Sequence, residues 1–447
     1  MSHSSTDVIP EPRTPKPGRR WRGLVFLVFS LVLVVWFAPQ FWLWRAECQI
    51  SALDWDGALQ SLKWSTWGLK TQGRTDFLRA RMHRKMGDLE AMATALHAAN
   101  RAGFPPVRLE REVWLAEAQR GNLGPIEPHL PGLLVAGQDL PELCEAYALG
   151  CIQNYRLAEA VEILNLWSAD FPTDPQPHYL LGRIQEHSTN YRGATQEYET
   201  ALRLAPRHAP AAFNLARVFV EELRYAEAAA AYRRATPLLY HPEPGVVGQA
   251  RCLRMDSQLP EAQAALQTLA QPPVDEVRRK IAYRLIGEPE EIASASRLVE
   301  QGQIEFALGN HAAAIPYFRE ALQKNPLDVG VRNAYGTSLR LTGRLQEATA
   351  EIAKVGEIQT ALSSCDPLLS RVRTHPEDVD ARIEIGKVFL KYLSEKQGLV
   401  WLNSVFAYDP DNAVAHTLLA EFYEAHSREH PESAELGQKH RDAIRNR

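Results

Sequence analysis

Cysteine is scarce in this sequence. The 447 residues include five cysteines, namely Cys48, Cys144, Cys151, Cys252 and Cys365. An odd number at such wide spacing fits neither a disulfide-rich scaffold nor a paired-cysteine zinc site. Cys144 and Cys151 are seven residues apart, about 10 Å along a helix axis, which is too far for a disulfide. We therefore expect the thiols to be core side chains.

An excess of charge of one sign is also lacking. The chain has 50 Lys and Arg against 54 Asp and Glu, a net charge of -4, and its isoelectric point is near 6.4. Without a strongly basic field, general nucleic-acid binding is not expected. Charged residues make up 23% and hydrophobic residues 45% of the chain, which excludes a mostly disordered protein.

The familiar catalytic and cofactor motifs are missing. The sequence has no G-x-x-x-x-G-K-[ST], C-x-x-C, H-E-x-x-H or G-x-S-x-G. His426 and His430 form one H-x-x-E-H match, the inverted zinc-protease pattern. Pro431 follows at once and 17 residues remain for a third ligand, so we interpret the match as a charged helix end. We expect no enzymatic activity, no metal and no cofactor.

One long apolar run stands near the amino end. Leu24 to Trp44 is 21 residues without a charge, about 31 Å as a helix and close to the ~30 Å hydrocarbon thickness. Aromatic residues gather at its far end, as in a membrane-interface belt; they are Trp36, Phe37, Phe41, Trp42 and Trp44. We predict a transmembrane helix over 23–44. A cleaved signal peptide is the alternative, but the run is long and lacks small residues before a cleavage site.

The charges around this run predict its orientation. Five basic residues precede it within 1–22, and only Arg45 follows closely. The positive-inside rule then makes 1–22 a disordered cytoplasmic tail and places the rest of the chain outside the cytoplasm, in a periplasm.

The remaining residues repeat with a period of 34. Ala160, Ala194, Ala228 and Ala262 are each 34 apart, and so are the small residues Ala148, Gly182, Ala216 and Ala250. Within 175–208 the pattern also includes Leu181, Tyr191, Tyr198, Ala201 and Pro206. This pattern resembles the tetratricopeptide repeat (TPR) family. The resemblance implies an all-α solenoid, a right-handed superhelix of helix pairs.

The period is interrupted twice. The matching alanines Ala262 and Ala314 are 52 apart, and Ala348 and Gly398 are 50 apart. Each excess is about one helix long, so we predict extra helices at 275–294 and 361–378. The predicted organisation after the membrane helix is degenerate repeats at 45–140, repeats at 141–274 and 295–360, and repeats with a cap at 379–447.

The resemblance also implies a binding surface. In the family, the first helix of each pair lines a concave groove, and certain positions of that helix face a ligand. The residues at those positions here are Arg81, Tyr179, Arg183, His187, Phe213, Arg217 and Arg251. They are interpreted either as solvated residues copied with the repeat or as a strip for carboxylates or an extended acidic peptide. The family's carboxylate clamp is not reproduced: Asn214 alone matches one of its positions.

These observations lead to one functional hypothesis and one alternative. We expect a membrane-tethered scaffold that binds partner proteins or extended peptides, some of them acidic, within an envelope complex. The alternative is a substrate adaptor or a non-catalytic subunit of an enzyme or secretion complex.

Overall fold

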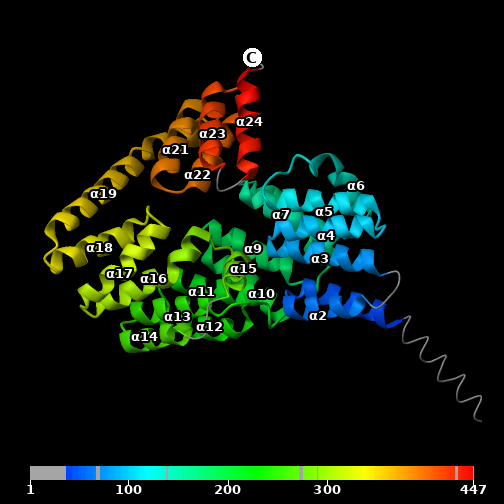
Figure 1. The fold of residues 1–447 in the computed structure, drawn as a ribbon, viewed down its shortest axis with the longest axis horizontal. Helices are drawn as coiled ribbons and strands as arrows, with labels where there is room; N and C mark the ends of the chain where they lie inside the picture. Colours follow the sequence, from blue (N-terminus) through cyan, green and yellow to red (C-terminus); the bar gives the residue numbers. More distant parts are fainter. Residues whose placement is uncertain are drawn as a thin grey trace, which may run out of the picture. The chain divides into compact units, whose positions relative to one another are not determined.

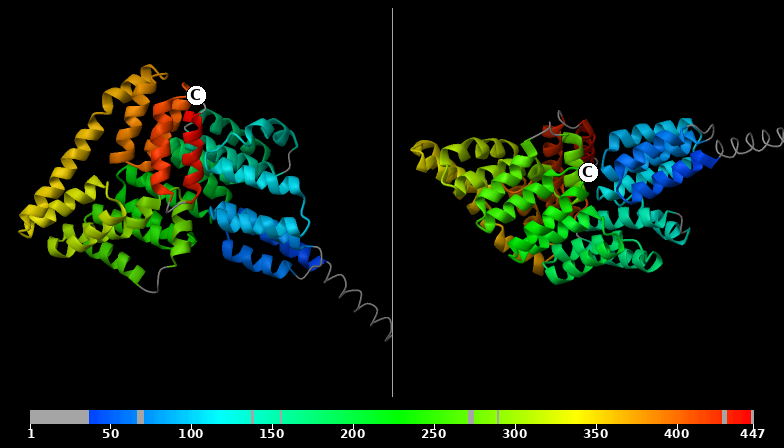
Figure 2. Two further views of the ribbon diagram at one scale, coloured as in Figure 1. Left: turned by 45° about the horizontal axis from the view of Figure 1, so that its top comes forward. Right: turned by 90° about the horizontal axis from the view of Figure 1, so that it is seen from below.

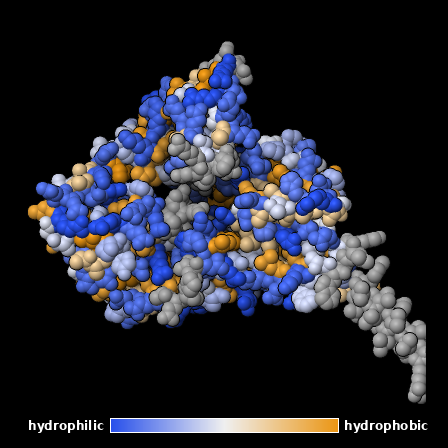
Figure 3. Space-filling view, viewed as in Figure 1, coloured by the Kyte–Doolittle hydropathy of each residue, from blue (hydrophilic) through white to orange (hydrophobic). Residues whose placement is uncertain are grey.

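The computed structural model describes residues 37–66, 71–136, 139–154, 156–270, 275–288, 290–427 and 431–445. Within these ranges the chain is helical and contains no strand. It divides into two compact units, residues 1–135 and residues 136–447, here called unit 1 and unit 2. In the view of Figure 3 most of the surface is hydrophilic, with apolar side chains scattered among the polar ones.

Unit 1 is a set of short antiparallel helices. Residues 37–51 are helical. The elements that follow are α2 (Trp55–Ser65), α3 (Gln72–Met86), α4 (Leu89–Arg101), α5 (Pro106–Gln119), the 3-10 turn η1 (Glu127–His129) and α6 (Leu130–Ala136). Asp54 and Asp88 cap α2 and α4, since their carboxylates accept backbone N–H groups of the first turn. Gly87 ends α3 with φ +75°, a conformation that glycine adopts without strain.

The core of unit 1 contains a buried charge cluster. The Arg84 Nε donates to Glu112 Oε1 at 2.5 Å, and Arg81 Nε lies 3.5 Å from Glu112 Oε2. The side chains of Arg84 and Glu112 are 0% and 1% exposed. Such charges are tolerated in a core only when they are paired. Arg81, predicted from the sequence to face a ligand, is thus a buried member of this cluster.

Unit 2 consists mainly of helix pairs, which can be followed in Figures 1 and 2. The pairs are α7 (Leu140–Gln153) with α8 (Leu157–Asp170), α9 (Gln176–His187) with α10 (Tyr191–Leu204), α11 (Ala209–Glu221) with α12 (Tyr225–Ala235), α13 (Glu243–Met255) with α14 (Leu259–Gln267), α16 (Glu290–Ala307) with α17 (His311–Lys324), α18 (Val329–Leu341) with α19 (Leu345–Ser363), α21 (Val379–Tyr392) with α22 (Glu395–Asn403), and α23 (Ala413–His426) with α24 (Pro431–Arg445). Short 3-10 turns lie at Thr236–Leu238, Thr268–Ala270 and Ser404–Ala407.

Small residues lie where paired helices approach each other. A Cβ added to Gly182 on α9 would lie 2.5 Å from the ring of Tyr198 on α10, and one added to Gly302 on α16 would lie 2.6 Å from the ring of Phe318 on α17. Ala194 on α10 is fully buried. The 34-residue spacing of small residues therefore reflects close helix crossings.

Two helices fall outside the pairs. They are α15 (Glu276–Leu285), within the predicted interval 275–294, and α20 (Asp366–Thr374), within 361–378. The helix α16 packs directly against α13 and α14, so the stacking of pairs continues past α15.

No helix in the described ranges is long and apolar enough to span a bilayer. Most of the predicted membrane segment, 23–36, and the tail before it lie outside the described residues. Residues 428–430 of the H-x-x-E-H match also lie outside them, and the described part holds no group of three candidate metal ligands. Four cysteines are buried as expected, but Cys48 is exposed, so the core prediction was wrong for that residue.

A histidine begins α11. The Nδ1 of His208 accepts the Ala211 N–H at 3.2 Å, which caps the helix, and its Nε2 lies 2.9 Å from Gln176 Oε1. The imidazole is therefore neutral, with its proton on Nε2. Burial lowers the pKa of His208 to about 4 from its ordinary 6.5.

This cap predicts a pH-dependent stability. His208 is harder to protonate in the folded chain than in the unfolded chain. The contribution of neutral His208 to the free energy of unfolding is therefore complete above pH 6.5 and is lost as the pH falls toward 4. Between pH 8 and pH 5 the loss should be about 2 kcal/mol. His208→Asn keeps a capping side chain without this titration. Urea unfolding of the wild type and of His208→Asn at pH 8 and pH 5 gives the difference between their free energies of unfolding. This difference should change by about 2 kcal/mol between the two pH values, and a difference that does not depend on pH would contradict the prediction.

Candidate protein-binding site on the first helices of unit 2

The helix α15 and the residues after it lie on the first helices α9, α11 and α13. The Tyr179 hydroxyl on α9 donates to the backbone carbonyl of Leu285 at 3.0 Å. The side-chain amide of Asn214 on α11 donates to the same hydroxyl at 3.5 Å. Burial raises the pKa of Tyr179, so the hydroxyl remains a donor. Tyr179, at a position of α9 predicted to face a ligand, thus binds a backbone carbonyl 106 residues away in sequence.

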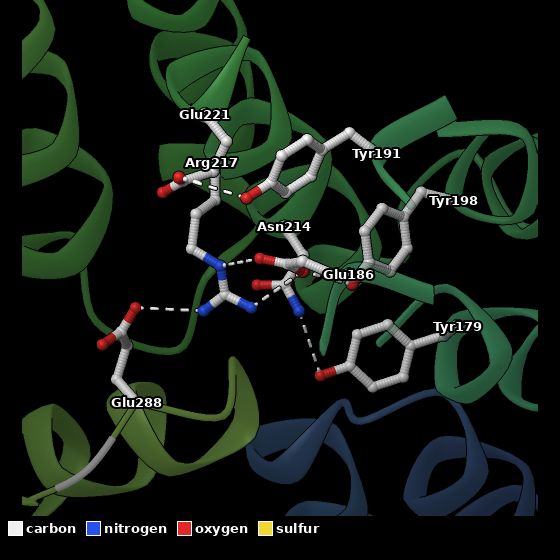
Figure 4. A network of polar contacts seen from close by, with 8 residues as sticks. All are labelled: Tyr179, Glu186, Tyr191, Tyr198, Asn214, Arg217, Glu221 and Glu288. Atoms are coloured by element: carbon white, nitrogen blue, oxygen red, sulfur yellow. Dashed lines mark hydrogen bonds and ion pairs between the residues drawn. The ribbon is translucent and has the colours of Figure 1, made fainter. Parts of the chain in front are cut away.

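Arg217 on α11 joins two carboxylates (Figure 4). Its Nε and Nη2 donate to Glu186 at 2.6 and 3.0 Å, and its Nη1 donates to Glu288 Oε1 at 3.1 Å. Burial alone would lower the pKa of Arg217, but the hydrogen bonds and charge of Glu186, with the charge of Glu288, outweigh it and raise the pKa. One of the two interpretations of the sequence was that Arg217 is a solvated residue. This was wrong: its side chain is 25% exposed and is paired on both sides.

Glu186 is fixed in turn by the second helix of its own repeat. The Tyr198 hydroxyl on α10 donates to Glu186 Oε2 at 2.7 Å. Because Tyr198 is also packed against Gly182, the position of the carboxylate depends on the close crossing of α9 and α10. The guanidinium of Arg217 is therefore oriented by Glu186, with Nη1 directed at the Glu288 carboxylate.

Arg183 and Arg251 occupy the equivalent position in the neighbouring repeats. A Cβ on Gly287, where φ is +82°, would lie 2.9 Å from Arg183 Nη2, so the backbone at Gly287 passes directly over that guanidinium. Arg251 is 47% exposed, and its Nε lies 3.7 Å from Glu300, a buried carboxylate that also accepts from Arg254 at 2.5 Å. The three arginines thus meet different groups: a backbone, an acidic side chain that follows α15, and an acidic side chain of α16.

Apolar contacts complete the attachment of α15. Tyr283 and Ile286 are 4% and 0% exposed and belong to one core cluster with Phe213, Tyr232 and Cys252. The rings of Phe213 and Tyr232 lie 4.9 Å apart, edge to face. At the other end of α15, Arg279 Nη1 lies 3.3 Å from Glu243 Oε1 on α13. The segment is therefore held by polar contacts at both ends and by apolar side chains between them.

The predicted site residues separate into three groups. Tyr179, Arg183, Phe213, Arg217 and Arg251 lie on the first helices of three consecutive repeats, and the surface they form is here called the first-helix face. His187 is exposed at the end of α9. Arg81 belongs to unit 1.

Sequence reasoning missed the residues that join the segment 276–288 to the first helices or orient Arg217. Glu186, Glu243, Tyr283 and Glu288 were not identified, although the interval 275–294 was recognised as an extra helix. A signal was available in the order Tyr283, Ile286, Gly287, Glu288, in which apolar side chains at helical spacing precede a glycine and an acidic residue. Nothing in the sequence indicates which surface that segment covers.

Comparison with known proteins identifies the repeats. Residues 179–238 and 299–357 match a family model described as tetratricopeptide repeat. Unit 2 therefore contains TPR repeats in an all-α solenoid. Among curated proteins, none matches this sequence.

The solved structures that match this chain share little sequence with it. YrrB, described as a TPR protein with an unusual peptide-binding site, is 20% identical over 49% of this chain and 95% of its own, with a TM-score of 0.27. A tetratricopeptide repeat protein from Parabacteroides merdae is 16% identical over 60% and 98%, with a TM-score of 0.38. Human IFIT1, as a dimer with m7Gppp-AAAA, is 14% identical over 82% and 90%, with a TM-score of 0.40.

Proposed function

We propose that this protein is a non-enzymatic TPR scaffold that is tethered to a membrane and holds partner proteins in an envelope complex. One observation carries the binding part of the proposal: the first-helix face takes up a backbone carbonyl through Tyr179 and a carboxylate through Arg217. These are the two kinds of acceptor that an acidic peptide offers. Repeats that stack into a solenoid also provide an extended surface for such contacts.

The membrane part rests on the charge-free run and on the helix that continues from it. Leu43, Ala46 and Ile50 form the buried face of helix 37–51. Phe37, Phe41 and Trp44 recur at helical spacing and are 62%, 49% and 59% exposed. Large exposed aromatic residues at the end of an apolar run suit the headgroup region of a bilayer, where aromatic rings gather. In this proposal the run over 23–44 spans the membrane, and the repeats lie outside the cytoplasm.

The proposed topology has a direct test. A reporter that is active only outside the cytoplasm, fused after residue 447, should be active because the basic residues before the run stay in the cytoplasm. Replacing the five basic residues of 1–22 by neutral ones is the matched control and should reduce that activity. Activity of a cytoplasm-only reporter at the same position would overturn the orientation.

The binding proposal is tested by co-purification from membranes followed by mass spectrometry. The Arg217→Glu variant should recover less of a partner that binds the first-helix face. The reversed charge repels the carboxylates of Glu186 and Glu288 and also the carboxylate of an acidic partner. The loss should be a few kcal/mol for a desolvated pair, and less than ~1 kcal/mol for an exposed one. Arg344→Glu is the matched control, since Arg344 pairs with Glu347 at the surface of the same unit. Equal partner recovery from all three proteins would contradict a role for this face.

A further inference from the structure

The segment 276–288 meets the first-helix face as a ligand meets a receptor. Each group that it presents has its own partner. The Leu285 carbonyl is held by Tyr179, and the Glu288 carboxylate by Arg217. The Tyr283 and Ile286 side chains enter the cluster of Phe213. These four groups lie in the last turn of α15 and in the three residues that follow it, and Arg279 in the first turn adds its pair with Glu243.

We propose that the first-helix face is a receptor for a short helix that ends in the order aromatic, two residues, aliphatic, glycine, acidic. Residues 276–288 are its resident intramolecular ligand. A partner protein with a segment of the same chemistry binds by displacing them. This inference rests on the proposed function as a protein-binding scaffold, and it adds the chemical class of the partner and the state of the free protein.

The arrangement of the repeats supports a receptor rather than a structural helix. The helix α16 packs on α13 and α14, so α15 does not carry the stacking from one pair to the next. A helix of 10 residues has little stability by itself. Its position therefore depends on its tertiary contacts, which are those with the first-helix face and a hydrogen bond of 2.6 Å between Tyr283 and Ser296 of α16. A partner that offers the same contacts to the first-helix face competes for them directly.

Among the residues of the segment, Gly287 restricts most strongly which partner sequences can bind. Gly287 has φ +82°, where a side chain is strained, and a Cβ there would lie 2.9 Å from Arg183 Nη2. The glycine lets the backbone pass over the guanidinium and turn so that the next carboxylate reaches Arg217. A partner segment without glycine at this place would be rejected by backbone strain and by collision with Arg183.

The proposal is tested with a labelled synthetic peptide of residues 275–288. In one variant of the full chain, residues 276–288 are replaced by a Gly-Ser linker of equal length. The peptide should bind this variant at least about tenfold more tightly than it binds the wild-type chain, in which the resident segment competes. Peptides carrying Gly287→Val or Glu288→Gln should each bind at least about tenfold more weakly than the native peptide. Arg217→Ala in the linker variant should weaken binding similarly, and Arg344→Ala should not.

If the linker variant does not fold, hydrogen exchange of the α15 amides in the wild-type chain, with and without peptide, tests the same proposal. The amides of α15 should exchange faster than those of α9 and α11, and excess native peptide, but not the Gly287→Val peptide, should accelerate them further. No peptide binding to a folded linker variant, or α15 amides as protected as α11 and unaffected by peptide, would overturn the proposal. If membrane partners still co-purify in that case, the scaffold function stands and only the displacement is wrong. If none co-purify, both are wrong.

Discussion

Replacing Glu112 by alanine is expected to destabilise unit 1 by about 3–5 kcal/mol, enough to unfold much of it. Glu112 is 1% exposed, and it is the carboxylate paired with Arg84 at 2.5 Å and with Arg81 at 3.5 Å. The variant leaves two guanidinium groups in the core without this counter-charge, and a buried charge that loses its ion-pair partner is costly. Urea unfolding and hydrogen exchange of α3 and α5 measure the effect, which should spare unit 2.

Two matched variants separate burial from charge in this experiment. Glu117→Ala removes a carboxylate that is 35% exposed, lies 4.0 Å from Arg120 directly after the same helix and accepts from Asn122 at 3.0 Å, and it should cost less than ~1 kcal/mol. Changing Arg81 and Arg84 to Met and Glu112 to Leu together should recover most of the stability, because apolar side chains of similar volume need no counter-charge. A Glu112→Ala protein as stable as Glu117→Ala would show that the cluster contributes nothing.

Gly182→Leu is expected to cost about 1–3 kcal/mol through overpacking. An added Cβ would lie 2.5 Å from the ring of Tyr198, which is fully buried and hydrogen-bonded to Glu186 and so cannot move aside easily. Because repeats contact mainly their neighbours, protection from hydrogen exchange should fall in α9 to α12 and persist in α21 to α24. Since Glu186 orients Arg217, the same variant should also loosen α15.

A glycine in an open position provides the control for this overpacking. Gly356 lies within α19, and a Cβ added there would meet nothing within 4 Å. Gly356→Ala should therefore stabilise the chain slightly, by about 0.5–1 kcal/mol, through helix propensity alone. Uniform loss of protection along unit 2 in Gly182→Leu, or none at all, would contradict the assigned helix crossing.

Local patterns predicted the repeat architecture because the cause of each pattern lies within one or two helices. A small residue every 34 positions marks a crossing such as that of Gly182 with Tyr198, and only a residue without a large side chain fits there. The excess lengths after Ala262 and Ala348 likewise indicated additional helices, because each excess has room for one short helix and its connections; the helices found there have 10 and 9 residues. These relations depend on sequence separations of less than two repeats.

The same patterns could not predict the state of the candidate site. The recurrence of Arg183, Arg217 and Arg251 determined that they share one face of the solenoid, and the Tyr179 and Phe213 positions followed from the same period. Whether that face is open or covered depends on Leu285 and Glu288, which lie 106 residues from Tyr179 and 71 residues from Arg217. A contact at such separation leaves no periodic trace, since the residues that meet are not copies of one another.

What the sequence determined by itself was therefore the helix pairing, the small residues at the crossings and the face on which the arginines recur, because each follows from side-chain size and helical period within a repeat. The tertiary structure alone decided that Arg217 is paired rather than solvated and that Arg81 is a core residue. It also decided that the chain's own residues 276–288 cover the part of the first-helix face around Tyr179, Arg183 and Arg217. Those outcomes depend on which distant carboxylate, carbonyl or aromatic ring the folded chain brings within hydrogen-bonding or van der Waals distance.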